Sequence, residues 1–495
     1  MPAREQTETI AFLRELAGGP PIETHISLVF LGTDTVWKLK KAVRLSFLDF
    51  SAPDARRHFC ERELALNAPA APGLYRDVVP IVRLADGRLA FGPRDDAPVL
   101  DWVLRMARVP AGDFLEARAA RGQIDGPLQD AVADAVAAYH ARLLPLPDAI
   151  PAMRNVLAGN VQAALSAGLP PDAVLAWDEA MRDGLDRIAS WLARRAHEGF
   201  MRRAHGDLHL GNLCLWQDKP VPFDALEFDE ALATIDLGYD LAFLLMDLDQ
   251  RVCRAAANRV LNRYVARTGD AALVRGLPVF LSLRAMVRAH VAARSGQAPE
   301  AQAYLDAAQA YLRPEAPVIV AIGGLPGSGK STVARAVAPD IGRTPGALIL
   351  RSDEIRKRQF GVAPEERLPK IAYTPEASRL VFETLADSVR IAASSGQAVI
   401  ADATFMSAAH RSMIAQAAKR AGVVWHGFWL DAPLSVLEQR VAARRGDASD
   451  ADIAVLRAAA GNDPGAGDWT RVDATDTVSA AAQIRKAITA ARELC

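Results

Sequence analysis

Hydrophobic and polar positions follow two periodicities along the chain, and together they predict most of its elements. In the stretches 132–143 and 177–196, apolar residues recur every three or four positions, which is the pattern of a helix with one buried face. Two short runs, 25–30 and 35–39, predict strands, and a helical stretch follows at 55–67. We therefore expect the first part of the chain to combine strands and helix, and the part after it to be mainly helical.

One break in this pattern marks a boundary between domains. A helical stripe over 300–312 ends at Pro314 and Pro317, because proline interrupts a regular element. The β-branched run 318–322 follows at once and ends in two glycines, which predicts a buried parallel strand. We therefore predict a first domain over 1–313 and a second over 314–495.

Composition narrows the class of protein without indicating an activity. The 495 residues suffice for two or three separate cores, and 51% hydrophobic with 24% charged residues is the balance of a soluble globular protein. With 58 Lys and Arg against 59 Asp and Glu, the net charge of −1 disfavours a broad basic surface for nucleic acid. Four cysteines without CxxC spacing predict neither disulfides nor structural zinc: Cys60, Cys214, Cys253 and Cys495. No signal peptide or membrane span is predicted, so we expect a cytoplasmic protein.

The most specific motif lies directly after the predicted strand 318–322. The segment 324–331 reads GLPGSGKS and matches the phosphate-binding pattern GxxxxGK[ST] between a strand and a helix. Its glycines let backbone N–H groups face the phosphates of a nucleotide. Lys330 is expected to reach the β- and γ-phosphates of ATP, and the Ser331 hydroxyl to hold Mg²⁺. The predicted nucleotide-binding residues are Gly324, Leu325, Pro326, Gly327, Ser328, Gly329, Lys330, Ser331 and Thr332.

Acidic residues end two further predicted strands of the second domain. Asp353 ends the run 348–353, and Asp402 lies in the run 398–404. In a doubly wound parallel sheet the carboxyl ends of the strands form the ligand edge, so both acids are expected beside the phosphate loop. We predict that Asp353 takes the proton of an attacking hydroxyl and that Asp402 helps to hold Mg²⁺. Capping of the following helices is the alternative role for both acids.

Three arginines are candidates for contacts with anionic groups. Arg356 follows Asp353 closely and is expected to fix an anionic substrate or the transferring phosphoryl group. Arg440 and Arg444 are four residues apart, which predicts that they share one helix face and belong to a lid over ATP. A solvated basic face is the alternative for this pair.

Residues 316–495 resemble the P-loop kinases of small metabolites and the related zeta-toxin and polynucleotide-kinase group. In that group a GxxGSGKS loop precedes an SD-x-x-R segment and a DAT strand, which stand here at 324–331, 352–356 and 402–404. The resemblance implies a P-loop domain with a doubly wound parallel sheet and ATP-dependent phosphorylation of a hydroxyl. It also implies the roles given above to the acid at 353 and to the three arginines.

A second phosphotransfer pattern lies at 205–212, which read HGDLHLGN. The spacing H-x-D-x-x-x-x-N parallels the kinase catalytic loop, in which the Asp takes the acceptor proton and the Asn holds Mg²⁺. Asp224 follows at a distance that suits two short strands returning the chain to the same site. We predict Asp207 as the base, and Asn212 with Asp224 as Mg²⁺ ligands. Zinc binding by the two histidines of this segment is the alternative.

This segment resembles the aminoglycoside phosphotransferase-like proteins, which have a protein-kinase-like fold. The resemblance covers about residues 20–300 and implies a small lobe over about 20–105 and a helical large lobe over about 106–313. It implies that His205 supports the catalytic loop and that the segment 235–242 braces it. The turn 31–34 departs from the kinase pattern, because it holds one glycine and lacks GxGxxG.

The small lobe carries the expected ATP-contacting ion pair of such a fold. The segment Val36–Lys38 resembles the strand with the ATP-contacting lysine, and Cys60–Glu63 resembles the helix with its acidic partner. We predict the pair Lys38 and Glu63. The alternatives are Lys40 and Lys41 for the lysine and Glu61 for the acid.

The predicted function is a two-domain enzyme in which each domain transfers the γ-phosphoryl group of ATP to a small-molecule hydroxyl with Mg²⁺. As the alternative, only the P-loop domain is catalytic, on a nucleotide sugar or a nucleic-acid 5′-hydroxyl, and the first domain regulates it. The near-zero net charge disfavours long nucleic acid. Glu227, Asp229 and Glu230 either receive a cationic acceptor such as an aminoglycoside or form a solvated turn.

Overall fold

The computed structural model describes residues 6–45, 48–93, 97–147, 152–444, 446–462 and 467–493. The chain forms two compact units, Met1–Val156 with Ser190–Leu244 and Leu157–Ala189 with Leu245–Cys495. Each unit thus contains two separate stretches of the sequence. The predicted limit between residues 313 and 314 lies inside the second unit and stays a prediction. Met1–Glu5 and Cys495 lie outside the described residues.

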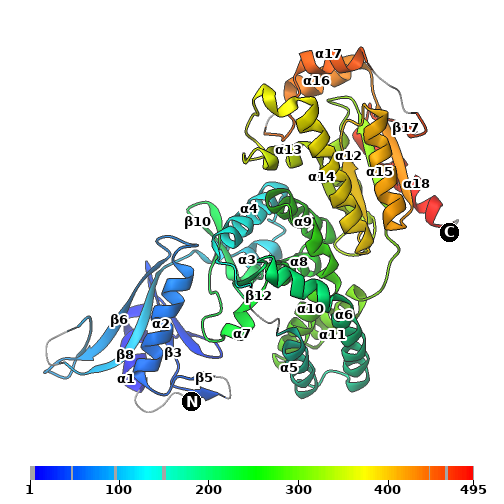
Figure 1. Cartoon of the computed structure of the whole chain (residues 1–495). Helices are drawn as coiled ribbons and strands as arrows, with labels where there is room; N and C mark the ends of the chain where they lie inside the picture. Colours follow the sequence, from blue (N-terminus) through cyan, green and yellow to red (C-terminus); the bar gives the residue numbers. More distant parts are fainter. Residues whose placement is uncertain are drawn as a thin grey trace. The chain divides into compact units, whose positions relative to one another are not determined.

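An antiparallel sheet forms the first part of unit one (Figure 1). Its strands, in spatial order, are β1 (Ile22–Glu23), β2 (Ser27–Leu31), β3 (Thr35–Lys40), β8 (Val99–Ala107), β6 (Tyr75–Arg83) and β7 (Leu89–Phe91). Leu39 and Val103 pack with Leu13 of helix α1 (Thr7–Ala17) on one face. Since side chains alternate along a strand, Lys38 and Lys40 point to the other face, against which α2 (Pro53–Asn67) packs.

Helices and two small antiparallel pairs complete unit one. The hairpin of β10 (Leu213–Trp216) and β11 (Lys219–Pro222) confirms the two short strands predicted between Asp207 and Asp224. The remaining elements are β4 (Arg44–Leu45), β5 (Leu48–Asp49), α3 (Leu115–Ala120), α4 (Gly126–Arg142), β9 (Met201–Arg203), α7 (Glu230–Ala233) and β12 (Thr234–Asp236). Three helices have residues in both units: α5 (Met153–Ser166), α6 (Pro171–His197) and α8 (Leu237–Arg251).

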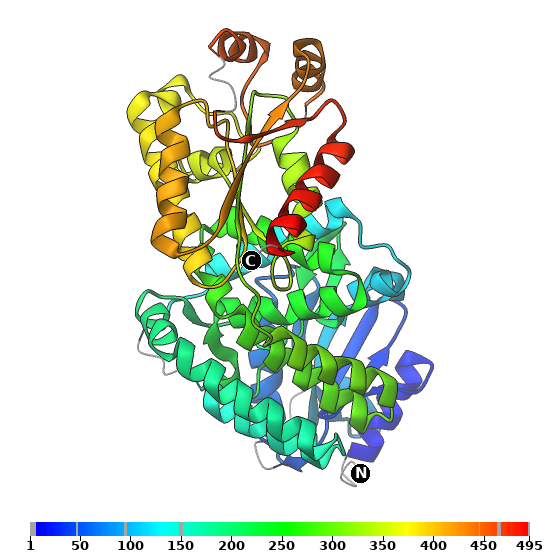
Figure 2. The ribbon, with the colours of Figure 1, turned by 90° about the vertical axis from the view of Figure 1, so that its right-hand side faces the viewer.

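A parallel five-stranded sheet forms the core of the C-terminal part of unit two. Its strands, in spatial order, are β14 (Leu348–Arg351), β15 (Val399–Asp402), β13 (Ile319–Gly324), β16 (Trp425–Asp431) and β17 (Thr470–Asp473). Figure 2 shows helices on both faces of this sheet, which explains its continuous apolar runs. The helices of these faces are α12 (Lys330–Val337), α14 (Pro375–Ser394), α15 (Ala408–Ala421) and α18 (Thr477–Glu493). The predicted fold class is confirmed: an antiparallel sheet with helices, followed by a doubly wound P-loop domain.

The strand order places the phosphate loop at the point where the sheet reverses direction. β13 comes first in sequence, β14 and β15 follow on one side of it, and β16 and β17 on the other. The loop after β13 therefore opens into the crevice where such folds bind ligands. The other helices of unit two are α9 (Arg254–Thr268), α10 (Leu277–Arg294), α11 (Ala298–Tyr311), α13 (Ser352–Gln359), α16 (Leu434–Ala443) and α17 (Ile453–Ala460).

Helix α9 covers the outer edge of β14. The Asn262 Oδ1 atom accepts the backbone N–H of Ile349 at 2.6 Å, and Asn258 donates to the carbonyl of Ala347 at 3.0 Å. These side chains take the place of a further strand, because an edge strand leaves such groups unpaired. Arg263 also pairs with Glu365 at 2.7 Å. A segment that precedes the predicted boundary thus forms part of the P-loop unit.

We expect Asn262→Ala to lower the free energy of unfolding of unit two by about 1–3 kcal/mol, because the buried Ile349 N–H loses its acceptor. The matched control is Asn462→Ala, since the side chain of the exposed Asn462, in the turn after α17 (Ile453–Ala460), donates to the carbonyl of Ala458. Urea unfolding and hydrogen exchange of the Ile349 amide measure both effects. Equal stability of the two variants would refute this role of Asn262.

Candidate functional sites

Three glycines of the loop between β13 and α12 adopt conformations that other residues rarely reach. Gly324, Gly327 and Gly329 have φ values of 141°, 84° and 88°. A Cβ atom would lie 2.6 Å from the carbonyl oxygen of Leu430 at Gly324 and 2.6 Å from that of Leu437 at Gly327. The loop can therefore turn its backbone inward only because glycine stands at these positions.

Lys330 and Ser331 begin α12 and present their side chains at the loop. The Lys330 ammonium donates to the carbonyl oxygens of Gly324 and Leu325, both at 3.0 Å. Burial lowers the pKa of Lys330, and the charges of Asp402 and Asp353 partly oppose that effect. The Ser331 hydroxyl donates to the Asp402 carboxylate at 2.6 Å. A hydroxyl beside a carboxylate is a set of hard oxygen donors that fits Mg²⁺.

Asp353 and Asp402 line the pocket near the carboxyl ends of β14 and β15. The prediction that Asp353 ends a strand is wrong, because β14 ends at Arg351 and Asp353 lies in the first turn of α13. Burial raises the pKa of Asp353 above the ordinary value, although Arg351 and Lys330 act against this. Arg351 pairs with Asp402 at 3.3 Å, and it also bonds Asp447 at 2.8 Å. The sequence interpretation missed Arg351. A charged residue at the end of an otherwise apolar strand was the signal that could have indicated it.

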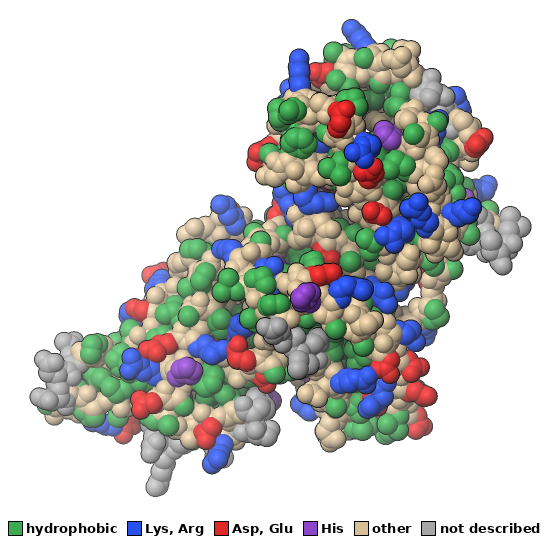
Figure 3. Space-filling view, viewed as in Figure 1, with side chains coloured by type: hydrophobic (Ala, Val, Ile, Leu, Met, Phe, Trp, Pro, Cys, Tyr) green, Lys and Arg blue, Asp and Glu red, His purple; other side chains and the backbone are tan. Residues whose placement is uncertain are grey.

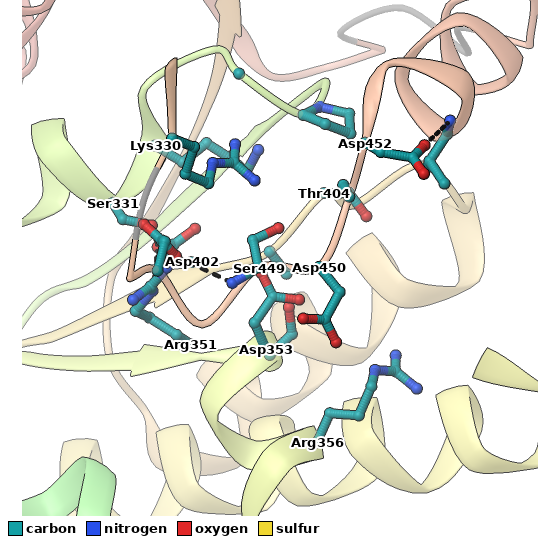
Figure 4. A pocket seen from close by; sticks show the side chains of 18 of the residues that line it. Lys330, Ser331, Arg351, Asp353, Arg356, Asp402, Thr404, Ser449, Asp450 and Asp452 are labelled. Atoms are coloured by element: carbon teal, nitrogen blue, oxygen red, sulfur yellow. Dashed lines mark hydrogen bonds and ion pairs between the residues drawn. The ribbon is translucent and has the colours of Figure 1, made fainter. Parts of the chain in front are cut away.

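These side chains line one pocket of about 880 Å³. Figure 4 shows Lys330, Ser331 and Asp402 with Asp353 around the same hollow, and Arg356 and Asp450 at its other end. The segments that contribute are the phosphate loop, α13, the ends of β14 and β15, the residues 367–373 and the residues 447–452. The predicted residues Pro326, Thr332, Arg440 and Arg444 also line this pocket.

Arg356 and Arg440 bind parts of their own chain. Arg356 is 7% exposed, donates to the Ala372 carbonyl at 2.6 Å and lies over the Tyr373 ring at 4.9 Å. Arg440 donates to the carbonyls of Ala474 and Thr475, both at 2.8 Å. Arg356 therefore stands at the pocket wall in a fixed orientation, and Arg440 fastens the loop before α18.

The prediction that Arg440 and Arg444 share one helix face is wrong. Helix α16 ends at Ala443, and Arg444 has an extended backbone with φ −62° and ψ 135°. Spacing by four residues places side chains together only where the helix continues. Both arginines still line the pocket, but from different kinds of structure.

In unit one, Lys38 forms ion pairs with both Glu63, the predicted acidic partner, and Asp224, the predicted Mg²⁺ ligand. Its ammonium lies 2.7 Å from the Glu63 Oε1 atom and 2.5 Å from the Asp224 Oδ1 atom. Burial alone would lower the pKa of Lys38, but Asp224 and Glu63 raise it well above its ordinary value. The structure thus brings together three residues that are far apart in the sequence.

The segment 205–212, which the sequence pattern predicts to be a catalytic loop, is held by buried hydrogen bonds. Asp240 accepts the backbone N–H groups of His205 and Gly206 at 3.0 and 2.9 Å, which confirms that the segment 235–242 braces the loop. His205 contacts the Phe223 carbonyl through Nε2 at 2.9 Å and accepts the Asp207 N–H at Nδ1. Burial lowers the pKa of His205, in keeping with a neutral ring. Since both ring nitrogens face backbone groups, His205 is a support of the loop and a poor zinc ligand.

Asp207, Asn212 and Asp224 present oxygen atoms in the same region. The Asn212 amide donates to the Asp207 carboxylate at 3.0 Å and to its carbonyl at 2.9 Å. Asp224 has φ 61°, a conformation rarely adopted by a non-glycine residue, and its N–H donates to the Tyr75 hydroxyl at 2.9 Å. Carboxylate and amide oxygens fit Mg²⁺. Tyr75 gave no signal in the sequence, because a strand tyrosine usually belongs to a core.

The competing residues of the small lobe have other partners. Lys41 pairs with Glu23 at 2.6 Å, and Glu61 pairs with Arg57 on the surface at 2.8 Å. Lys40 is completely buried and pairs with both Glu63 and Glu227. The assignment of the ATP-contacting pair to Lys38 and Glu63 stays a prediction, and Lys38 is the lysine that pairs with the Asp224 carboxylate.

The acids after Asp224 do not form a solvated turn as a group. Glu227 is only 4% exposed, since it faces Lys40. Asp229 caps α7 by accepting the Leu232 N–H at 2.9 Å, and Glu230 pairs with Arg62 and Arg203. The interpretation as a solvated turn is therefore wrong for Glu227, and all three acids have partners within the chain.

Comparison with known proteins identifies the domain that holds the phosphate loop. Residues 318–462 match the family model of an AAA domain. The matched range runs from the start of the parallel sheet to the end of α17, so it contains Lys330, Asp353 and Asp402. This part of the chain is a P-loop domain of the nucleotide-binding kind.

The chain is also similar to several proteins over longer stretches. An uncharacterized protein of Mycobacterium tuberculosis is 29% identical over 483 residues, which cover 92% of this chain and 91% of that protein. A choline kinase structure from Cryptosporidium parvum has a TM-score of 0.38 at 11% identity and covers 61% of this chain and 93% of its own. A gluconokinase structure from Sinorhizobium meliloti has a TM-score of 0.24 at 18% identity and covers 36% and 98%. The mycobacterial similarity includes both units.

The surface shows no concentration of one charge on the face seen in Figure 3, where basic and acidic side chains are interspersed. This agrees with the net charge of −1. Among the helices of the described ranges, none has the length and apolar character needed to cross a bilayer.

Proposed function

We propose that the chain is an ATP-dependent phosphotransferase with two sites, each of which transfers the γ-phosphoryl group to a hydroxyl of a small molecule. One observation carries the proposal: Lys330, the pair of Ser331 and Asp402, and Asp353 line a single pocket. This set supplies a cation for the phosphates, oxygen ligands for Mg²⁺ and a base for the acceptor.

In the P-loop site, the acceptor oxygen forms a bond to the γ-phosphorus while the bond from that phosphorus to the β,γ-bridging oxygen breaks. The products are ADP and the phosphorylated acceptor, and the hydroxyl proton passes to Asp353. Lys330 stabilises the charge on the phosphate oxygens. Ser331 and Asp402 would hold Mg²⁺, which supplies further charge neutralisation when it is bound.

The acceptor of the P-loop site is proposed to be anionic. Arg356 lies at the end of the pocket beyond Asp353 (Figure 4), and Arg367 and Lys370 also line the pocket. The acid at this end, Asp450, already accepts bonds from Lys357 and Tyr373 at 2.7 and 2.6 Å. Arg356 uses Nη1 on the Ala372 carbonyl, while its Nε has no partner among the residues that the structure describes. Arg356 and Lys370 can therefore receive a carboxylate or phosphate of the acceptor.

In unit one, the same reaction is proposed with Asp207 as the base. Lys38 would contact the phosphates of ATP, and Asn212 with Asp224 would hold Mg²⁺. A regulatory nucleotide-binding role is the second candidate for this unit. It is favoured by the short connection from β2 to β3, whose Gly32 carbonyl is held by Arg108 at 2.6 Å instead of forming a long phosphate-covering loop.

A phosphate-transfer screen tests the proposal. The full chain is incubated with labelled Mg·ATP and with sugars, sugar acids, nucleosides, aminoglycosides, amino alcohols or 5′-hydroxyl oligonucleotides. The variants Lys330→Ala and Asp207→Asn are run in parallel. An acceptor that is no longer labelled by the Lys330→Ala variant is a substrate of the P-loop site, and one that is no longer labelled by the Asp207→Asn variant is a substrate of unit one. Transfer that survives in both variants, or no transfer to any acceptor, would contradict the proposal of two phosphotransfer sites.

The pH dependence of the P-loop reaction follows from the buried base. Asp353 must be ionised to take a proton, and burial raises its pKa above the ordinary value of about 3.9. We expect kcat/KM, measured in the Asp207→Asn background, to fall as the pH drops through that raised pKa. Asp353→Asn should remove most of the rate at every pH. Asp387→Asn is the matched control, because Asp387 is an exposed acid of α14 outside the pocket lining; equal rates in both variants would exclude Asp353 as the base.

A further inference from the structure

Two lysines on β3 share one carboxylate in unit one. Lys38 and Lys40 lie two residues apart on a strand and therefore point to the same face of the sheet. Glu63 of α2 receives Lys38 on Oε1 at 2.7 Å and Lys40 on Oε2 at 2.8 Å. The second partner differs, because Lys38 reaches Asp224 and Lys40 reaches Glu227, each at 2.5 Å.

The two lysines differ in access to a ligand. The Lys38 side chain is 13% exposed and its partner Asp224 is 40% exposed. Lys40 and Glu63 have no exposed side-chain surface, and Glu227 has almost none. Lys40 therefore cannot touch a nucleotide, whereas Lys38 lies beside a carboxylate that solvent and a metal ion can reach.

Residues 225–227, directly after Asp224, are held by hydrogen bonds and an ion pair to other parts of unit one. The Ala225 N–H donates to Asn67 of α2 at 2.9 Å, and Asn67 donates in turn to the Glu63 carbonyl at 2.8 Å. Glu227 is held by Lys40, and the Leu226 carbonyl accepts from Arg203. Lys40 is thus the link by which β3 holds both the Glu63 carboxylate and this segment.

We propose that Lys40 is a positioning residue that holds Glu63 and the segment 224–230 in place, so that Lys38 can exchange Asp224 for a nucleotide phosphate while Asp224 accepts Mg²⁺. The inference rests on the nucleotide site proposed for unit one. With Lys40 on its other oxygen, Glu63 remains paired when Lys38 turns toward a phosphate. Asp224 remains in position because its neighbours 225 and 227 are bonded.

The test measures binding of a fluorescent ATP analogue to the full chain in a Lys330→Ala background. The weakened P-loop site is then the same in every variant, so a difference in binding between variants reports on unit one. Lys40→Met is expected to raise the Mg²⁺ concentration that gives half-maximal tight binding by about tenfold or more, as for a lost hydrogen bond to a charged group. Binding without Mg²⁺ should change little. Lys41→Met is the matched control, since Lys41 pairs with the largely exposed Glu23.

A second variant separates positioning from stability. In Lys40→Met/Glu227→Leu both buried charges are replaced by apolar groups, which is often neutral or favourable for a fold. We expect thermal stability to recover in this variant while the raised Mg²⁺ requirement persists. A purely structural role predicts instead that both recover together, and that outcome would overturn the inference.

Lys38→Met distinguishes this inference from the function on which it rests. If Lys38→Met abolishes Mg·ATP binding in unit one and Lys40→Met behaves like Lys41→Met, only the positioning role is refuted. If Lys38→Met also binds Mg·ATP like the parent, the proposed nucleotide site itself is refuted. A raised Mg²⁺ midpoint in Lys40→Met that persists in the double variant supports both.

Discussion

Replacing Lys330 with alanine is expected to lower kcat at the P-loop site by about 10²–10³-fold, the range for loss of one preorganised electrostatic donor. The Lys330 ammonium lies at the mouth of the loop, bonded to the carbonyls of Gly324 and Leu325. The glycines that shape the loop remain in the variant, so its backbone N–H groups still receive the phosphates. Nucleotide affinity should therefore fall less than kcat. Initial rates of label transfer in the Asp207→Asn background measure this effect on the P-loop site alone.

The control for this variant is Lys419→Ala, which removes an exposed lysine from the last turn of α15. It changes the net charge equally but lies outside the pocket lining. An unchanged rate in Lys419→Ala with a large loss in Lys330→Ala would support the assignment. If both variants transfer phosphate at the parental rate, Lys330 has no part in the reaction.

The sequence was sufficient to predict those elements whose structure depends on residues close to one another in the chain. The run 318–322 predicts a buried strand because apolar β-branched residues on both faces fit a covered parallel sheet, and β13 lies there. Gly327 and Gly329 occupy positive φ values, as a loop that turns its backbone inward requires. The hairpin between Asp207 and Asp224 is predicted from the spacing of these two acids, which suits two short strands that return the chain to one site. In each case neighbouring residues carry the signal.

Contacts between distant residues could not be predicted in the same way. Asn262 and Ile349 are far apart in the sequence, and nothing in α9 indicates that its side chains cover a strand edge. A buried charge is stable only with a partner. Because no partner was evident for Lys40 or Glu227, the sequence interpretation assigned these two residues to solvent or to a ligand, whereas the structure pairs them with each other. That partner is known only once the fold brings the two segments together.

The end of α16 shows a different limit of the sequence interpretation. The spacing of Arg440 and Arg444 suits a helix face, but the helix ends one residue before Arg444. Helix ends depend on how the last carbonyls are satisfied, and they are therefore less certain than helix interiors. Both arginines nevertheless line the pocket, and their membership of a lid over ATP stays a prediction.

The geometry around Asp207 determines what a change at this position should do. Its carboxylate is 42% exposed, lies 3.5 Å from the His209 Nε2 atom and accepts the Asn212 amide at 3.0 Å. Asparagine has almost the same shape, so the loop braced by Asp240 should keep its fold. It carries no negative charge, however, and cannot act as a base at neutral pH.

Asp207→Asn is therefore expected to lower phosphotransfer by unit one by about 10²–10⁴-fold, the usual contribution of a general base. The rate is measured in the Lys330→Ala background with the acceptor that the screen assigns to this unit. Binding of Mg·ATP and thermal unfolding should change little, because Lys38, Glu63 and Asp224 are intact. Asp218→Asn is the matched control, since Asp218 lies exposed in the β10–β11 turn with φ 61°, which asparagine also tolerates. Equal activity of the two variants would exclude Asp207 as the base and favour the regulatory role of unit one.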